Sequence, residues 1–107
     1  MFRPSFQECA DASEGVTPAM QDCIADEYEF HDQQLNANYR ALMASLPKDR
    51  AAALRQTQRN WIAERDQACR WNAEEEGQAG RLVANHCLLE RTAKRAVELA
   101  NMKHDVH

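Results

Sequence analysis

The stretch "SLPKD", residues 45–49, separates two long segments of helical sequence. Pro47 disfavours helical geometry at the residue before it, while its ring fits the first turn of a following helix. One helix is therefore expected to end near residue 46 and the next to begin near residue 47. Because a short connection makes consecutive helices antiparallel, this stretch predicts a helical hairpin.

The segment before this break predicts one long helix. Thr17 and Pro18 offer an N-cap followed by proline at the first helical position, where its missing N–H costs nothing. Apolar and aromatic side chains then recur every three or four residues, as on one buried helix face. The predicted inner residues are Met20, Ile24, Tyr28, His31, Leu35, Tyr39, Leu42 and Leu46.

The segment after the break predicts a second helix over residues 47–76 with a more polar inner face. The sequence "EEEGQAG", residues 74–80, closes it with two glycines. A new apolar stripe from Leu82 to Ala100 then predicts a third helix. The inner face of the second helix is expected to carry Ala51, Leu54, Gln58, Trp61, Arg65, Ala68 or Cys69, and Asn72.

The 107 residues are expected to form one all-α domain, a disulfide-stapled antiparallel helical hairpin or three-helix bundle. Glycine and proline occur only three times each, which favours helix over sheet. Residues 1–16 are predicted to be an irregular lead-in, with room for a short helical turn, that a disulfide ties down. Residues 17–103 form the predicted helical domain, and residues 104–107 a frayed tail.

The charge pattern excludes one large class of partner. The net charge is −4, and the basic residues are scattered among acids, so the basic patch of a nucleic-acid-binding protein is missing. A cationic partner is favoured instead. No apolar run reaches the roughly 18 to 20 residues that cross a bilayer, and "MFRPSFQECA", residues 1–10, lacks the apolar core of a signal peptide. We expect neither a membrane span nor a leader in this sequence.

Four cysteines, at positions 9, 23, 69 and 87, predict two disulfides. A zinc site would need closely spaced pairs such as C-x2-C, which are absent. Disulfides place the protein in an oxidising compartment, the bacterial periplasm or the extracellular space. Reflection of the chain about residue 78 sets Cys69 beside Cys87 and favours a Cys9–Cys23 partner bridge. Reflection about the "LPK" turn leaves a second pairing open, Cys23–Cys69 with Cys9–Cys87.

A polar stripe marks the second helix in "QRNWIAERDQAC", residues 58–69. By reflection about the turn, Arg65 is expected to face residues 28–32, with Asp32 and Glu29 as its carboxylate partners and Asp66 assisting. Gln58 and Tyr39 are expected to hydrogen-bond each other. These groups, Asp32, Tyr39, Gln58, Trp61, Arg65 and Asp66, are interpreted as a network that fixes the register of the helices rather than as a ligand site.

Three motifs in order carry a family resemblance. They are "LNANY" (35–39), "QRNWIAERDQAC" (58–69) and "CLLERTAKRAVEL" (87–99). Together with the cysteines they resemble the LprI-like lysozyme-inhibitor family, which includes YecT-like secreted proteins, from about Cys9 to Leu99. The resemblance implies a small exported bacterial protein, helical and disulfide-bonded, and some members are associated with lysozyme inhibition. The matching positions read as scaffold, so they support the fold more than an activity.

The resemblance and the charge together favour inhibition of a lysozyme. An acidic protein would be steered toward a strongly basic c-type lysozyme or another cationic envelope protein. A cleft-blocking inhibitor needs a protruding tip, and the two tips are "LPKDR" (46–50) and "EEEGQAGR" (74–81). Lys48, Arg50 and Arg81 on these tips are the candidate contact residues. The alternative is a structural or interaction module of the cell envelope.

An enzyme is not expected. The sequence has no G-x-S-x-G, H-E-x-x-H or phosphate-binding loop, and no C-x-x-C for thiol redox chemistry. Its four histidines are dispersed, without a second ligand or base at a useful spacing. No catalytic residue, cofactor or metal is therefore assigned.

Overall fold

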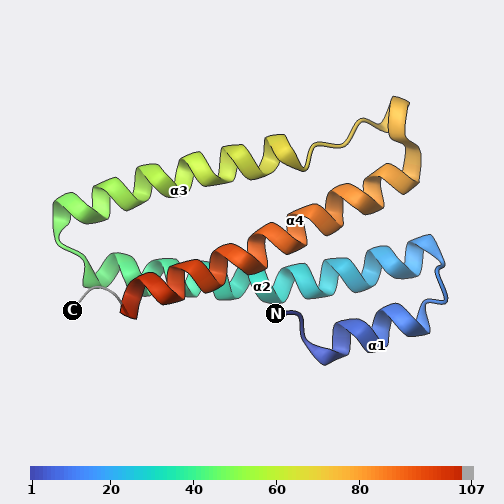
Figure 1. Cartoon of the computed structure of the whole chain (residues 1–107), viewed down its shortest axis with the longest axis horizontal. Helices are drawn as coiled ribbons and strands as arrows, with labels where there is room; N and C mark the ends of the chain where they lie inside the picture. The colour runs from blue at the N-terminus through green and yellow to red at the C-terminus, as the bar shows by residue number, and fades with distance from the viewer. Residues whose placement is uncertain (105–107) are drawn as a thin grey trace.

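The computed structural model describes the backbone of residues 1–104 and the side chains of residues 1–102. Within these residues the chain is all helical, as predicted, with two disulfides. The molecule is long and flat, with principal extents of 48 × 32 × 15 Å. Figure 1 shows α2 and α4 crossing along the molecule, α3 beside them and α1 folded back on the first half of α2. The helices are α1 (Pro4–Ala12), α2 (Thr17–Ser45), α3 (Lys48–Ala68) and α4 (Ala73–His104).

The break at residues 45–49 is confirmed. Leu46 has extended backbone angles, φ −95° and ψ 147°, and α3 begins directly after Pro47. The start of α2 is confirmed as well, with Pro18 in its first turn. Thr17 is not the N-cap, however, because it is already helical, and Val16 takes the cap position without a side-chain hydrogen bond. The proline therefore places this helix start without help from a side-chain cap.

The predicted boundary between the second and third helices was wrong. α3 ends at Ala68, and the three glutamates belong to the first turn of α4. Asn72 caps this turn, because its Oδ1 accepts hydrogen bonds from the backbone N–H groups of Glu74 (3.0 Å) and Glu75 (3.4 Å). An asparagine followed by acidic residues is a start signal, since carboxylates are favourable near a helix N-terminus. Gly77 then interrupts the helix with a positive φ of 63°.

The prediction of an irregular lead-in was also wrong over Pro4–Ala12, because these residues form a nine-residue helix. Pro4 occupies its first turn, where a proline is favourable. The helix ends before Glu14 and Gly15, whose φ values of 51° and 80° are left-handed. Of the tail predicted to fray, His104 is the last residue of α4, and residues 105–107 lie outside the described residues.

The apolar core lies between α2 and α4. Leu35 and Leu42 of α2 pack with Ala96 and Leu99 of α4, and Leu99 is fully buried. α3 contributes only half-buried side chains to this cluster, and the one residue that it buries is polar, Gln58. The prediction of a polar inner face on the second helix is thereby confirmed. The half-buried side chains that pack against the core are Tyr39, Leu46, Leu54, Trp61 and Met102.

Candidate functional site

The polar stripe of α3 faces a cleft of about 380 Å³ between α2 and α3, called here the α2–α3 cleft. It brings together five of the six residues predicted to form a network, while Asp66 is exposed and does not line it. The cleft is lined by Asp32, Leu35, Asn36, Tyr39, Arg55, Gln58, Arg59, Trp61, Ile62 and Arg65.

Arg65 does not pair with Asp32 or Glu29 as expected. Its Nε and Nη2 each lie 3.0 Å from Oδ1 of Asp66, and its Nη1 donates to Oγ1 of Thr92 at 3.3 Å. The reflection that predicted a partner on α2 assumed that α2 and α3 lie in direct register. Figure 1 shows instead that α4 runs between them at the end of α3 where Arg65 lies, so the guanidinium reaches α4.

Gln58 hydrogen-bonds Arg95 rather than Tyr39. Nε of Arg95 donates to Oε1 of Gln58 at 3.0 Å, and Nη1 donates to Glu98 at 3.1 Å. Arg95 is only 6% exposed, and its Nη2 has no hydrogen-bond partner among the described residues. Its guanidinium lies 5.8 Å from the Trp61 ring centre, and that of Arg65 lies 5.1 Å away. Arg95 was missed as the centre of the network, although it stands in the third family motif.

The two disulfides are Cys9–Cys23 and Cys69–Cys87, the pairing favoured from the sequence, with Cα–Cα distances of 5.7 and 5.5 Å. Among the described residues no cysteine is free. The first bridge fastens α1 to α2, and the second joins the end of α3 to α4. Figure 1 shows that the α1–α2 turn and the start of α4 lie at the same end of the molecule, on the right.

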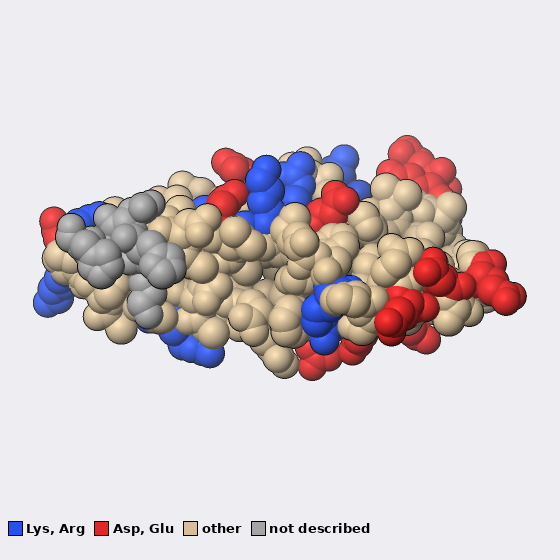
Figure 2. Space-filling view, turned by 60° about the horizontal axis from the view of Figure 1, so that its bottom comes forward, with Lys and Arg blue, Asp and Glu red and all other residues tan. Residues whose placement is uncertain are grey.

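This disulfide-bonded end is strongly acidic. Residues 4–26 and 73–80 contain neither lysine nor arginine. Figure 2 shows acidic side chains gathered at this end, over the α1–α2 turn and the start of α4. We call this surface the acidic end; its exposed carboxylates are Glu8, Asp11, Glu14, Asp22, Asp26, Glu74, Glu75 and Glu76.

The tip of the acidic end is ordered by its own hydrogen bonds. Trp71 is half-buried, and its indole Nε1 donates to the carbonyl oxygen of Gly77 at 2.8 Å. The guanidinium of Arg81 lies 5.7 Å from the centre of the same indole ring. Of the predicted contact residues, Arg81 is therefore exposed beside this tip, whereas exposed Lys48 and Arg50 lie at the opposite end of the molecule.

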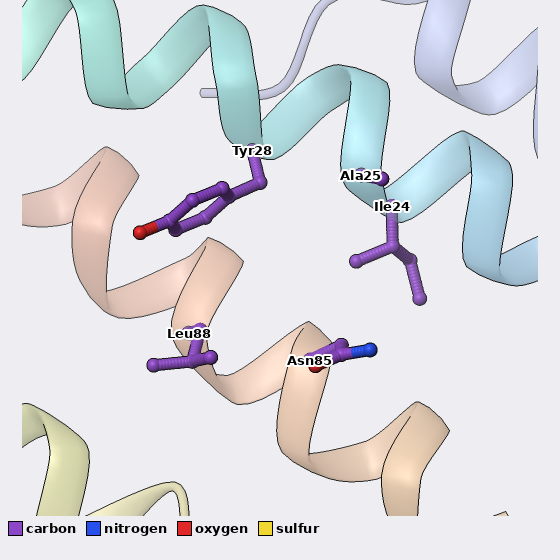
Figure 3. A pocket seen from close by; sticks show the side chains of 5 residues that line it. All are labelled: Ile24, Ala25, Tyr28, Asn85 and Leu88. Carbon is purple, nitrogen blue, oxygen red and sulfur yellow. The ribbon is translucent and has the colours of Figure 1, made fainter. Parts of the chain in front are cut away.

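A small apolar pocket lies beside the acidic end, where α2 and α4 begin to diverge. It has a volume of about 220 Å³, and Ile24, Ala25, Tyr28, Asn85 and Leu88 line it. Figure 3 shows Tyr28 of α2 and Leu88 of α4 facing each other across it. Asn85 donates its Nδ2 hydrogen bond to Gln21 at 2.8 Å, which ties the two walls together.

A buried ionic cluster that the sequence did not reveal attaches the N-terminus to α2. Glu27 is 1% exposed and accepts hydrogen bonds of 2.7 Å from both the backbone N–H and Nε of Arg3. His31 Nε2 lies 2.8 Å from Oε2 of the same carboxylate. Burial raises the pKa of Glu27, but the hydrogen bonds from Arg3 and His31 outweigh it and leave the pKa below its ordinary value. The only signal in the sequence was the spacing of Glu27 and His31, four residues apart on one helix.

Among the described residues, neither a metal-binding cluster nor a membrane-spanning helix is present. No three histidine, cysteine or acidic side chains in that part of the chain come close enough together to hold a metal ion. None of the described helices has the length and apolar character needed to span a membrane. The features described above are a cluster of exposed charges, a small apolar pocket and a polar cleft.

Comparison with known proteins identifies the family. A family model described as lysozyme inhibitor LprI matches residues 9–99, which span both disulfides and all three sequence motifs. Searches of curated proteins and of solved structures gave no match. The residues matched make up most of the 107, so the chain belongs to the LprI family of lysozyme inhibitors.

Proposed function

We propose that this protein inhibits a lysozyme by binding a basic, c-type enzyme through its acidic end. The family is the first support, since its model is that of an inhibitor. The single observation that carries the choice of surface is the clustering of eight exposed carboxylates in two segments without lysine or arginine. Such a cluster attracts a cationic protein from a distance and orients it before contact.

The tip offers the rigid contact that inhibition requires. Trp71 is bonded to Gly77, Asn72 caps α4, and the Cys69–Cys87 bridge fastens both sides of the turn. A surface that is ordered before binding loses less conformational entropy when a partner docks. Arg81 stands at this tip among the glutamates, so it is the proposed basic residue that reaches the catalytic carboxylates of the lysozyme cleft.

The apolar pocket supplies an anchor next to the charges. A side chain of the partner that enters between Tyr28 and Leu88 would lose water on both sides, beside the carboxylates of the acidic end. Interfaces of this kind hold much of their binding energy in a few buried anchors, with charge at the rim setting the association rate. Lys48 and Arg50 lie too far from this surface to contribute to the proposed contact.

The two disulfides support a site of action outside the cytoplasm, since such bonds persist in oxidising compartments. We place the protein in the periplasm or the secreted fraction, where a lysozyme would be met.

The proposal is tested by inhibition assays of the oxidised protein against c-type, g-type and i-type lysozymes, with binding followed by calorimetry. We expect inhibition of the c-type enzyme that weakens as salt is added. The variant Glu75→Gln/Glu76→Gln should weaken inhibition about fivefold, the effect of roughly 0.5 kcal/mol for each of the two rim charges. The matched control Asp49→Asn/Glu64→Gln removes two exposed carboxylates of α3 that are not among those of the acidic end, and it should change inhibition less than twofold.

Absence of binding to all three lysozymes at micromolar concentration would overturn the proposal. Equal losses in the two double variants would overturn the choice of surface, because net charge rather than the acidic end would then govern binding.

A further inference from the structure

We propose that the α2–α3 cleft binds a small sugar that carries a carboxylate. The cleft lies outside the acidic end, and this inference does not rest on lysozyme inhibition. It rests on the charge of the cleft wall, on one unpartnered N–H of a buried guanidinium behind that wall, and on the mixture of aromatic, amide and hydroxyl groups within it.

The cleft is a basic site in an acidic protein. Three arginines line it, Arg55, Arg59 and Arg65, against one carboxylate, Asp32, so its formal lining charge is three minus one, +2. The whole chain, in contrast, carries −4. Arg65 is occupied by Asp66, but within the described part of the chain Arg55 and Arg59 form no ion pair. A planar guanidinium without a partner is suited to hold a carboxylate through two parallel hydrogen bonds.

Arg95 lies behind the cleft wall, where it is paired with Glu98 at 3.1 Å. Its guanidinium contacts Gln58 and Trp61, which both line the cleft, and its buried Nη2 is left without a hydrogen-bond partner among the described residues. A buried charged group with an unsatisfied N–H is costly, and an anion nearby offsets part of that cost. The network therefore does more than fix the helix register, because it leaves one buried N–H of Arg95 unpartnered behind the wall, while the positive charge at the cleft itself comes from Arg55 and Arg59.

The remaining lining groups suit a sugar better than a simple inorganic anion. Tyr39 and Trp61 provide aromatic surface, and the amides of Asn36 and Gln58 provide donors and acceptors for hydroxyl and acetamido groups. Arg95 occupies Oε1 of Gln58, which fixes the amide and leaves its Nε2 for a ligand. The volume of about 380 Å³ falls in the range typical of small-molecule sites. Such a lining accommodates one sugar ring together with its acidic substituent.

The test compares two sugars that differ only in a carboxylate-bearing group. N-acetylmuramic acid carries a lactyl ether that N-acetylglucosamine lacks, and lactate alone represents the substituent without the sugar. Binding is followed by two-dimensional NMR of the two indole N–H groups of the oxidised protein. The Trp61 signal reports on the cleft. Trp71 does not line the cleft and is bonded to Gly77 at the acidic end, so its signal is an internal control.

We expect N-acetylmuramic acid at millimolar concentration to shift the Trp61 signal and leave that of Trp71 in place. Both N-acetylglucosamine and lactate should bind at least tenfold more weakly. The variant Arg55→Gln/Arg59→Gln should weaken binding of the acidic sugar at least tenfold; both side chains are exposed, so the fold is preserved. The matched control Lys48→Gln/Arg50→Gln removes two exposed cations outside the cleft and should change binding less than twofold.

Three results would overturn the proposal. The first is no shift of the Trp61 signal with N-acetylmuramic acid. The second is that N-acetylglucosamine or lactate binds as tightly as N-acetylmuramic acid. Equal binding of N-acetylglucosamine would show that the carboxylate plays no role, and equal binding of lactate would show that the sugar plays none. The third is unchanged binding in the Arg55→Gln/Arg59→Gln variant, which moves the site elsewhere.

Discussion

The α2–α4 pair and α3 are held in the molecule by different physics. α2 and α4 bury Leu35, Leu42 and Leu99 against each other, whereas the one residue that α3 buries is Gln58. α3 contacts the pair through half-buried side chains and a few hydrogen bonds to α4. It is also tied covalently, by the short turn at Pro47 and by the Cys69–Cys87 disulfide. The difference teaches that the apolar pair provides most of the buried apolar contact, while the polar attachment of α3 leaves an open cleft against α2 and a hydrogen-bonded connection to α4.

The largest expected effect is on the apolar pair. Leu99→Ala should lower the free energy of unfolding by about 2–5 kcal/mol, because a fully buried leucine leaves a cavity. Leu54→Ala on α3 makes the same change at a half-buried position and should cost about 1 kcal/mol. Urea unfolding of the oxidised proteins measures both. Equal costs would contradict the division between the two regions.

The next largest effect concerns the covalent attachment of α3. Cys69→Ser/Cys87→Ser opens a loop with a sequence separation of 18 and should cost about 3 kcal/mol. Hydrogen exchange should then speed up in α3 and in residues 69–80, while residues 31–42 of α2 and 89–99 of α4 remain protected. The Cys9→Ser/Cys23→Ser variant is the control, since it should loosen α1 instead. Uniform loss of protection in both variants would show that α3 is part of one cooperative core.

A smaller effect is expected from the polar attachment. Gln58→Leu leaves the buried Nε of Arg95 without its acceptor and should cost about 1–3 kcal/mol. In a double-mutant cycle with Arg95→Met, the second change should cost less once the first is present, because both remove the same hydrogen bond. Unfolding by urea gives the coupling energy. Additive costs would mean that this bond does not attach α3.

The smallest effect is the pH dependence from Glu27. Its pKa is lowered in the folded protein, so its ionised form adds stability that is fully present above the unfolded pKa, about 4.3. That contribution is lost as the pH falls through the lower, folded pKa. The free energy of unfolding should therefore decline less steeply below about pH 4.3 in Glu27→Gln than in the wild type. Parallel pH profiles would rule out Glu27 as a source of acid sensitivity.

Local signals in the sequence were sufficient for the main helices. Pro47 and the spacing of apolar residues in α2 predicted the hairpin, and the cysteine positions favoured the disulfides that the structure contains. The boundary between α3 and α4 was predicted too late in the chain, because the two glycines at residues 77 and 80 indicated a helix end there. Asn72 and the acidic turn that follows it instead start α4. The cap and the charges decide where α4 begins, and Gly77 only kinks it.

The long-range polar partners could not be predicted in the same way. Reflection about a turn treats helices as parallel rods, but α4 enters between α2 and the end of α3, so Arg65 meets Thr92 and Gln58 meets Arg95. The bond between Arg3 and Glu27 spans 24 residues and depends on how α1 folds back, which no local pattern encodes. The sequence nevertheless predicted part of the cleft lining, since five of the residues that line it belong to the predicted polar network.

The central claim is that the acidic end, and not the opposite end, meets a lysozyme. Hydrogen exchange of the oxidised protein, alone and with an excess of a c-type lysozyme, tests it most directly. We predict slower exchange of the backbone amides in residues 69–87 and 8–26 on binding, with unchanged exchange in residues 46–50. Protection confined to residues 46–50, or to the outer face of α3, would contradict the account.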